Sequence, residues 1–267
     1  MKRRNFLIGL TLISALSLLP LTSYARESEL TIGIFPGTGT ADLPLEELQA
    51  GIAPFIQALT TTVGLKPKLT IFRTIKNVTR SLEKGRLDVY FVPPTVAINV
   101  LDNGYVPVAR VKDPQSGTLV RVKGATVKAV ALGEKQSWLD VMGRHVLKLN
   151  KLEVEIVSLK TQEDVVLAME HDYAQAGALS PKLANELVAK GSHEIWYPLP
   201  PTPGFTLMAS DRLSEDNQNK LGAAAVALQP DILQPLQKVI TGKVTGFVVD
   251  KQADYKTLKL AFRAAGY

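Results

Sequence analysis

Strand-like and helix-like segments alternate regularly along this chain. From residue 30 to residue 111, short apolar runs are followed by stretches whose apolar residues recur at helical spacing. The first pair is a strand pattern at 30–35 and a helical pattern at 45–59, in which Gly51 and Pro54 predict a kink or a break. Such alternation predicts an α/β fold with a mainly parallel sheet that helices cover on both faces.

Two segments rich in turn-forming residues, 113–117 and 200–204, interrupt the alternation. They predict a first lobe that begins at 26–111, a second lobe at 112–203, and a completion of the first lobe at 204–267. If the first and third blocks pack together, two short crossings join two α/β lobes. A cleft between such lobes is a favoured place for a small ligand.

The N-terminal segment 1–25 has the three parts of a secretory signal peptide. Basic residues stand at positions 2–4, an apolar run follows at 6–21, and a small-x-small pattern ends at Ala25. We therefore expect cleavage after Ala25. The sequence Arg-Arg-Asn-Phe-Leu at 3–7 also resembles a twin-arginine signal, and the general secretory route remains open beside it.

The composition after the signal segment favours a periplasmic location. The chain has no cysteine, so it offers neither a disulfide nor a lipid-carrying cysteine at the cleavage site. No later stretch is long and apolar enough to cross a bilayer. An exported protein without an anchor is retained only where an outer membrane encloses the compartment, and we expect it to be a monomer there.

The charge pattern argues against nucleic acid as a partner. Removal of residues 1–25 takes away three basic residues and lowers the formal net charge from +6 to +3. No dense run of Lys and Arg interleaved with aromatic residues is present. The partner predicted for the remaining chain is a small-molecule solute.

Candidate ligand-binding residues occur where predicted strands end, because ligands of open α/β sheets bind beyond the carboxyl ends of strands, close to helix N-termini. Each candidate also has a purely structural interpretation as a turn, a cap, a solvated side chain or a packing residue. The candidates are Thr38, Gly39, Thr40, Arg73, Thr74, Pro94, Thr95, Ser137, Trp138 and Gly177.

Catalytic and metal-binding patterns are weak in this sequence, so we predict no enzyme activity, no metal site and no cofactor. His145, His171 and His193 are scattered and lack metal-ligand spacing. The segment 37–39, Gly-Thr-Gly, lacks the third glycine of a dinucleotide fingerprint and the second half of a phosphate-binding loop.

Several short sequences, in a fixed order, carry a family resemblance. They are Leu-Thr-Ile-Gly-Ile-Phe-Pro at 30–36, Glu-Lys-Gly-Arg-Leu-Asp-Val-Tyr-Phe-Val-Pro-Pro at 83–94, Gly-Tyr-Val-Pro-Val-Ala-Arg at 104–110, Tyr-Ala-Gln-Ala-Gly-Ala at 173–178, Pro-Gly-Phe-Thr-Leu-Met-Ala-Ser at 203–210 and Ala-Asp-Tyr-Lys-Thr-Leu at 253–258. With these features the chain resembles the phosphonate/phosphite/phosphate-type substrate-binding proteins of ABC importers, which are class II periplasmic binding proteins.

The resemblance implies a two-lobed class II fold with mixed, mostly parallel sheets and helices on both faces. It implies a periplasmic protein that closes on a small, often anionic solute, phosphonate/phosphate-like or an organic acid, and delivers it to a membrane permease. The ligand loops would follow the strands that end at Phe35, Phe72, Val92, Leu132 and Leu179.

Two other functions remain open beside import. The same fold could present its solute to a membrane histidine kinase as a sensor, or the chain could be a periplasmic enzyme or accessory factor. Two sequence features depart from the phosphonate-binding pattern. Where those proteins carry a Ser/Thr-rich loop, residues 133–138 hold one hydroxyl and an added carboxylate, and the second lobe is shorter between Val122 and Thr126.

Overall fold

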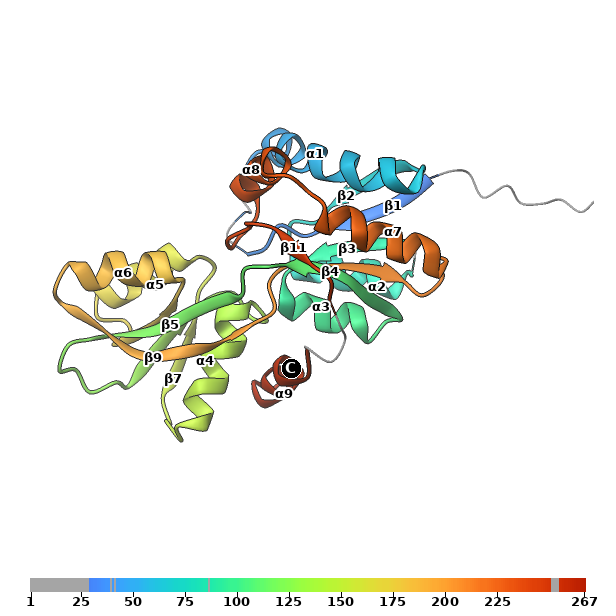
Figure 1. Cartoon of the computed structure of the whole chain (residues 1–267). Helices are drawn as coiled ribbons and strands as arrows, with labels where there is room; N and C mark the ends of the chain where they lie inside the picture. Colours follow the sequence, from blue (N-terminus) through green and yellow to red (C-terminus); the bar gives the residue numbers. More distant parts are fainter. Residues whose placement is uncertain (1–28, 39, 41, 86, 251–254) are drawn as a thin grey trace, which may run out of the picture.

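The computed structural model describes residues 29–38, 40, 42–85, 87–250 and 255–267, and shows two β-sheets with helices packed around them (Figure 1). The predicted signal segment 1–25 and the candidate residue Gly39 lie outside the described residues. The predicted mixed α/β class is confirmed.

The larger sheet combines strands from both ends of the described chain. Its order is β11-β4-β10-β3-β1-β2. Strand β1 pairs in parallel with β2 and β3, whereas β10 is antiparallel to both β3 and β4. The strands are β1 (Glu29–Ile34), β2 (Lys66–Ile71), β3 (Val89–Val92), β4 (Tyr105–Val111), β10 (Thr206–Ser210) and β11 (Phe247–Val248).

The smaller sheet is built only from the middle of the chain. Its order is β7-β6-β8-β5-β9, with β6 parallel to β7 and β8, and β5 antiparallel to β8 and β9. The strands are β5 (Gln115–Val122), β6 (Ala129–Leu132), β7 (Glu155–Ser158), β8 (Ala176–Leu179) and β9 (His193–Thr202). The parallel pairs bring the ends of β6 and β7 to the same edge of this sheet.

Helices cover both faces of the larger sheet because successive side chains of a strand point to opposite faces. In β3, Val89 and Phe91 pack in one core cluster with helices α1, α7 and α8, whereas Tyr90 and Val92 pack in another with α2, α3 and α9. These helices are α1 (Leu45–Val63), α2 (Ile75–Glu83), α3 (Pro94–Leu101), α7 (Glu215–Val226), α8 (Pro230–Val239) and α9 (Lys256–Ala264).

Three further helices pack on the smaller sheet: α4 (Trp138–Leu149), α5 (Gln162–Glu170) and α6 (Pro181–Ala189). Helix α5 begins with a capping box, in which the Thr161 side chain accepts from the Asp164 N–H and the Asp164 side chain accepts from the Thr161 N–H. The Ser137 side chain caps α4 by accepting from the Asp140 N–H. These caps fix where each helix begins.

The two crossings between the sheets are paired strands rather than loose loops. The predicted break at 200–204 was partly wrong, because β9 continues to Thr202, and Gln115 of β5 pairs with Thr202. The prolines of β9 are tolerated since β9 is the edge strand of its sheet, where a missing N–H need not break a ladder. The crossings therefore form a hydrogen-bonded ribbon.

The expected break in the first helix was also wrong. Helix α1 runs as one helix through Pro54. Proline removes the hydrogen bond to the carbonyl group four residues earlier, which here belongs to Ala50. Ala50 is exposed, so water can solvate that carbonyl group. In the described part of the chain, no helix combines the length and the apolar character that a membrane crossing requires.

Candidate functional site

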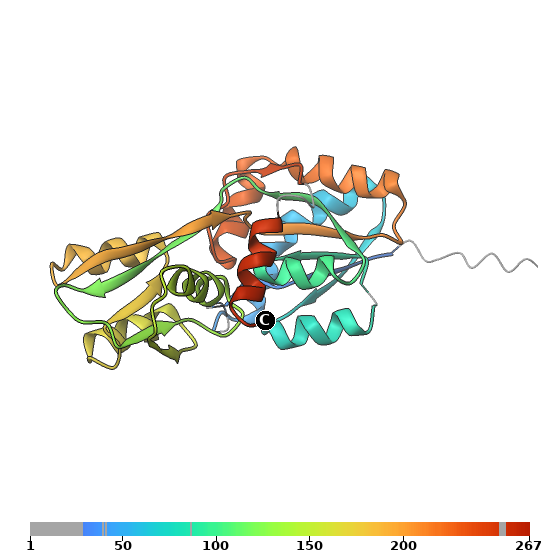
Figure 2. The same cartoon turned by 90° about the horizontal axis from the view of Figure 1, so that it is seen from below.

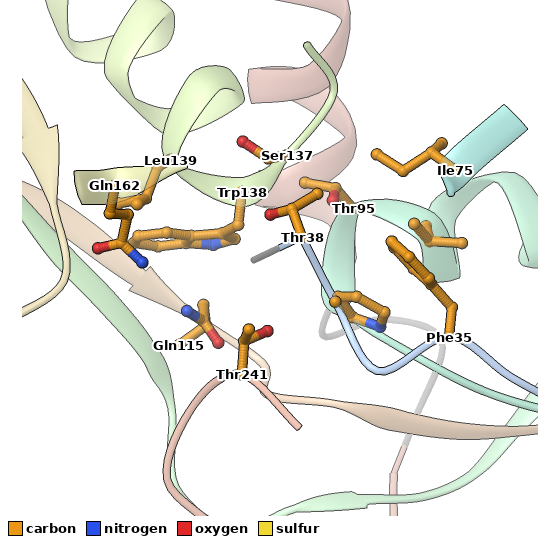
Figure 3. Close-up of a pocket in the computed structure, with 13 residues that line it drawn as sticks. Phe35, Thr38, Ile75, Thr95, Gln115, Ser137, Trp138, Leu139, Gln162 and Thr241 are labelled. Atoms are coloured by element: carbon orange, nitrogen blue, oxygen red, sulfur yellow. The ribbon is translucent and has the colours of Figure 1, made fainter. Parts of the chain in front are cut away.

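A small cavity lies between the two sheets (Figure 3). Its volume is about 50 Å³. Its lining comes from both sheets and from one crossing strand: Phe35, Gly37, Thr38, Ile75, Pro93, Thr95, Val96, Gln115, Ser137, Trp138, Leu139, Gln162 and Thr241.

The ends of parallel strands place this lining. In the larger sheet, the loop after β1 contributes Thr38, and the start of α3 after β3 contributes Thr95. In the smaller sheet, the loop after β6 contributes Ser137, and the start of α5 after β7 contributes Gln162. The cavity thus lies beyond the carboxyl ends of strands from two sheets that face one another, which is the expected position for a ligand in this type of fold.

Four helices begin at the cavity wall. The first helical residues of α2 and α4, Ile75 and Trp138, line the cavity, as do Thr95 near the start of α3 and Gln162 at the start of α5. The first turn of a helix leaves backbone N–H groups without intrahelical partners and carries a partial positive charge. This convergence favours an anion in the cavity.

Side-chain hydrogen-bond donors are also available at the cavity. Thr95 is 2% exposed, and no hydrogen bond of its hydroxyl group is found within the described part of the chain. The Ser137 oxygen accepts from the Asp140 N–H at 3.3 Å, which leaves its hydroxyl proton to donate. The Gln162 Oε1 accepts from the Ser180 N–H at 2.7 Å, so its amide nitrogen is the remaining donor.

The indole ring of Trp138 forms one wall. Its Nε1 donates to the Thr202 hydroxyl of β9 at 2.7 Å, and the residue is 5% exposed. Gly117 of β5 lies close to the indole ring, and a Cβ at this position would approach Trp138 Cζ3 to 2.9 Å. Figure 3 shows the ring near the side chains of Gln115 and Gln162. The crossing ribbon therefore fixes the orientation of the indole.

No charged side chain is among the described residues that line this cavity. A second cavity of about 190 Å³ adjoins it and shares Thr38, Gln162 and Thr241. The second cavity does contain charges, from Glu134, Lys160 and Glu163, beside Gly133 and Thr161. Burial raises the pKa of Glu134 above its usual value, since desolvation disfavours the carboxylate.

The structure brings together four of the residues predicted from the sequence: Thr38, Thr95, Ser137 and Trp138 all line the first cavity. They come from three separate segments, and Figure 3 shows Thr38 and Thr95 close to Ser137. Whether they contact a ligand stays a prediction.

The other described candidates are not among the lining residues, and each has a local role. The Thr40 hydroxyl donates to the Gly37 carbonyl at 2.8 Å, and an Arg73 nitrogen donates to the Leu43 carbonyl at 2.6 Å. Thr74 caps α2, Pro94 opens α3, and Gly177 gives room to Val165 and Met169, which a Cβ there would approach to 2.6 and 2.7 Å.

Three lining residues with polar side chains were missed by the sequence analysis: Gln115, Gln162 and Thr241. Gln162 directly follows Thr161, which the sequence already marks as a helix cap, so it could have been found by the same rule that selected Ser137. No local sequence pattern marks Gln115 or Thr241. Their place at the cavity depends on the path that the chain takes between the two sheets.

The three histidines have local surroundings of their own. Across the described ranges, no group of three or more His, Cys, Asp or Glu residues could hold a metal ion. His193 is 4% exposed, and its Nδ1 lies 2.9 Å from the Ser192 hydroxyl. Burial lowers the pKa of both His193 and His145 below the usual value of 6.5.

The chain has a family match and several structural relatives. The family model for the periplasmic substrate-binding protein of phosphonate ABC transporters matches residues 40–255. XAC2383 from Xanthomonas citri bound to ATP is similar with a TM-score of 0.71 and 14% identity, over 90% of this chain and 98% of that chain.

Two further relatives have the same fold. PhnD1 from Prochlorococcus marinus in complex with methylphosphonate has a TM-score of 0.66 and 13% identity, over 90% of this chain and 98% of that chain. The aliphatic sulphonate binding protein SsuA from Escherichia coli has a TM-score of 0.57 and 14% identity, over 90% of this chain and 86% of that chain. The comparison with curated proteins gives no match.

Proposed function

This chain belongs to the family of phosphonate periplasmic substrate-binding proteins of ABC transporters, and from that premise we propose that its inter-sheet cavity captures a small tetrahedral oxyanion. The phosphonate and sulfonate groups are the two classes that we expect to bind. The protein then delivers the solute to the membrane permease of its transporter.

The observation that supports this proposal most is Thr95, a buried residue that lines a cavity where four helices begin. Its hydroxyl group has no hydrogen-bond partner among the described residues, so it is ready to donate to an acceptor in the cavity. Neutral donors and helix N-termini stabilise an anion without a buried cation. These donors and helix N-termini would therefore bind the oxyanion, although residues 133–138 lack the Ser/Thr-rich loop of the phosphonate-binding pattern.

The size of the cavity sets the size of the bound group. A cavity needs roughly 10–15 Å³ to hold one water molecule. About 50 Å³ therefore suits a group of a few heavy atoms, such as a phosphonate or sulfonate head. We place the organic substituent of the ligand in the adjoining cavity of about 190 Å³, beside Glu134 and Lys160.

Two of the structural relatives support this choice of ligand class, since one holds methylphosphonate and another is a binding protein for aliphatic sulphonates. Their identity to this chain is low, so the chemistry of the cavity must decide between phosphonate and sulfonate. Both present three oxygen atoms to hydrogen-bond donors.

A thermal-shift experiment tests the proposal. The purified protein without residues 1–25 is heated with phosphate, methylphosphonate, ethanesulfonate or acetate, each up to millimolar concentration. A ligand at about 100 times its dissociation constant adds about 2.7 kcal/mol to the free energy of unfolding, so the melting temperature should rise with a phosphonate or sulfonate. If acetate alone raises it, or if none does, the oxyanion proposal is wrong.

We also propose that residues 1–25 direct export to the periplasm and are removed after Ala25. N-terminal sequencing of protein recovered from the periplasm should begin at Arg26. Replacing Arg3 and Arg4 by Lys should block export only if the twin-arginine route is used, so this variant separates the two routes. Size-exclusion chromatography with light scattering should give the mass of a monomer.

We propose lobe limits at 26–111 with 204–267 and at 112–203. Sheet membership supports this division, because the strands of 112–203 make one sheet and the remaining described strands make the other. Helix α9 is the exception, since it contacts both α3 of the larger-sheet part and α4 of the smaller-sheet part.

A further inference from the structure

Helix α9 is anchored to the larger sheet at its start. Tyr255, directly before the helix, is fully buried, and its hydroxyl group hydrogen-bonds to Thr206 of β10 and to the Asp250 carboxylate. One turn into the helix, the Lys259 ammonium group donates to Asp102 at the end of α3 at 2.6 Å. The beginning of α9 is therefore fixed on the side of the larger sheet.

The other end of α9 is anchored to the smaller sheet through α4. The Tyr267 hydroxyl donates to Oδ2 of Asp140 at 2.5 Å, and the Lys148 ammonium group donates to the Ala264 carbonyl at 3.4 Å. Figure 2 shows α9, in red, lying between the two halves of the molecule. Helix α9 is thus a third connection between the halves, in addition to the paired crossings β5 and β9.

Asp140 links the C-terminal end of α9 to the cavity wall. It is completely buried in the first turn of α4, where Oδ1 accepts from Arg144 Nε at 2.7 Å and Oδ2 accepts from the Gln136 N–H at 3.0 Å. Gln136 has a φ of 67°, a left-handed conformation that is unfavourable for a residue with a side chain. The same turn presents Ser137 and Trp138 to the cavity.

We propose that Tyr267 is a positioning residue for ligand binding. Its hydroxyl group completes the hydrogen bonds of Asp140, and Asp140 in turn holds the left-handed turn at Gln136 so that Ser137 faces the solute. Because α9 starts on one sheet and ends on the other, this hydrogen bond also favours the arrangement in which both halves contact the solute. The inference rests on the proposed oxyanion function of the cavity.

The variant Tyr267→Phe tests this inference. It keeps the ring that packs against Phe262 at 5.5 Å between centroids, and removes only the hydroxyl group. The lost hydrogen bond goes to the Asp140 carboxylate, and hydrogen bonds to charged groups contribute more to stability than neutral ones. Its loss should destabilise the turn that faces the solute, so we expect about a tenfold weaker affinity for methylphosphonate by isothermal titration calorimetry. An affinity equal to that of the unmodified protein would overturn the proposal.

A matched tyrosine separates positioning from general stability. The Tyr105 hydroxyl donates to the Leu87 carbonyl at 2.7 Å within the larger-sheet half and away from the cavity lining. We expect Tyr105→Phe to lower the melting temperature and leave the methylphosphonate affinity unchanged. Equal losses of affinity in both variants would show that Tyr267 acts only through stability, and would overturn the proposal.

A ligand-independent measurement distinguishes failure of this inference from failure of the proposed function. Hydrogen exchange of the amide groups at Gln136 and Ser137 should be faster in Tyr267→Phe than in the unmodified protein, because the turn loses its support. If the unmodified protein binds no member of the oxyanion panel, the proposed function fails and this exchange still tests the role of Tyr267. Unchanged exchange at both amides would overturn that role.

Discussion

Thr95 is the residue whose change should separate ligand binding from stability. We expect Thr95→Val to weaken the affinity for the preferred oxyanion about tenfold, because a hydrogen bond to a charged group is lost. The side chain is buried and nearly isosteric with valine, and no protein hydrogen bond of its hydroxyl is found among the described residues, so the ligand-free melting temperature should not fall. Calorimetry and thermal unfolding measure the two effects.

Thr206 provides the matched control for this prediction. It is as buried as Thr95, but its hydroxyl group bonds to the Gly204 carbonyl and to Tyr255, and it does not line the cavity. Thr206→Val should therefore reduce the free energy of unfolding by about 1–3 kcal/mol and leave the affinity unchanged. The reverse pattern, with Thr95→Val destabilising and Thr206→Val weakening binding, would contradict the assignment of the site.

Buried His193 and half-buried His145 predict a dependence of stability on pH. Burial lowers the pKa of His193 and His145 below 6.5 in the folded protein, although Glu170 opposes the shift at His193. The unfolded chain then binds protons more readily than the folded one, so the free energy of unfolding should decrease as the pH falls below about 6.5. Melting temperatures between about pH 8 and pH 5 measure this decrease. A slope in His193→Gln as steep as in the unmodified protein would exclude His193 as a source.

The rule that ligands bind beyond the carboxyl ends of strands predicted only part of the cavity lining. Thr38, Thr95 and Ser137 were found because a loop that follows a parallel strand must emerge at the ligand edge. Arg73 occupies a similar place in the sequence, yet its long side chain reaches the Leu43 carbonyl group instead. Local patterns cannot decide between such partners, because the choice depends on how distant loops pack.

At the scale of secondary-structure elements, Gly177 tests the packing of α5 on β8. A Cβ at this position would approach Val165 Cγ1 and Met169 Sδ within 2.7 Å, so the helix would have to move away from the strand. Gly177→Ala should reduce the free energy of unfolding by about 1–3 kcal/mol, as overpacked cores do, without changing the ligand affinity. A loss of affinity without a loss of stability would contradict this packing role and indicate that Gly177 belongs to the ligand site.

The elements themselves were largely predictable, and the exceptions have physical causes. Helix caps such as Thr161 and Ser137 are local, so the starts of α5 and α4 follow from neighbouring residues. The strand character of 200–202 is not local, since proline in a strand is acceptable only at an edge, and the edge position of β9 is a property of the whole sheet. The two-residue strand β11 is likewise defined only by its pairing with β4.

For the whole molecule, the cavity lining predicts that the ligand brings the two halves together. Thr95 belongs to the larger-sheet half, whereas Ser137 and Gln162 belong to the smaller-sheet half, so one bound oxyanion can accept hydrogen bonds from both. A ligand that contacts both halves binds the closed arrangement better than an open one and increases its population. The paired crossings β5 and β9 are the segments about which such a movement can occur.

Small-angle X-ray scattering should detect this movement as a smaller radius of gyration when the preferred oxyanion is added. Thr95→Val should reach the same compact state only at a higher ligand concentration, because its hydroxyl contributes to affinity and not to the shape of the closed form. Tyr105→Phe should compact at the same concentration as the unmodified protein. If calorimetry shows saturation while the scattering curve does not change, the cavity binds its ligand without closure, and the preformed volume of about 50 Å³ alone sets the size of the bound group.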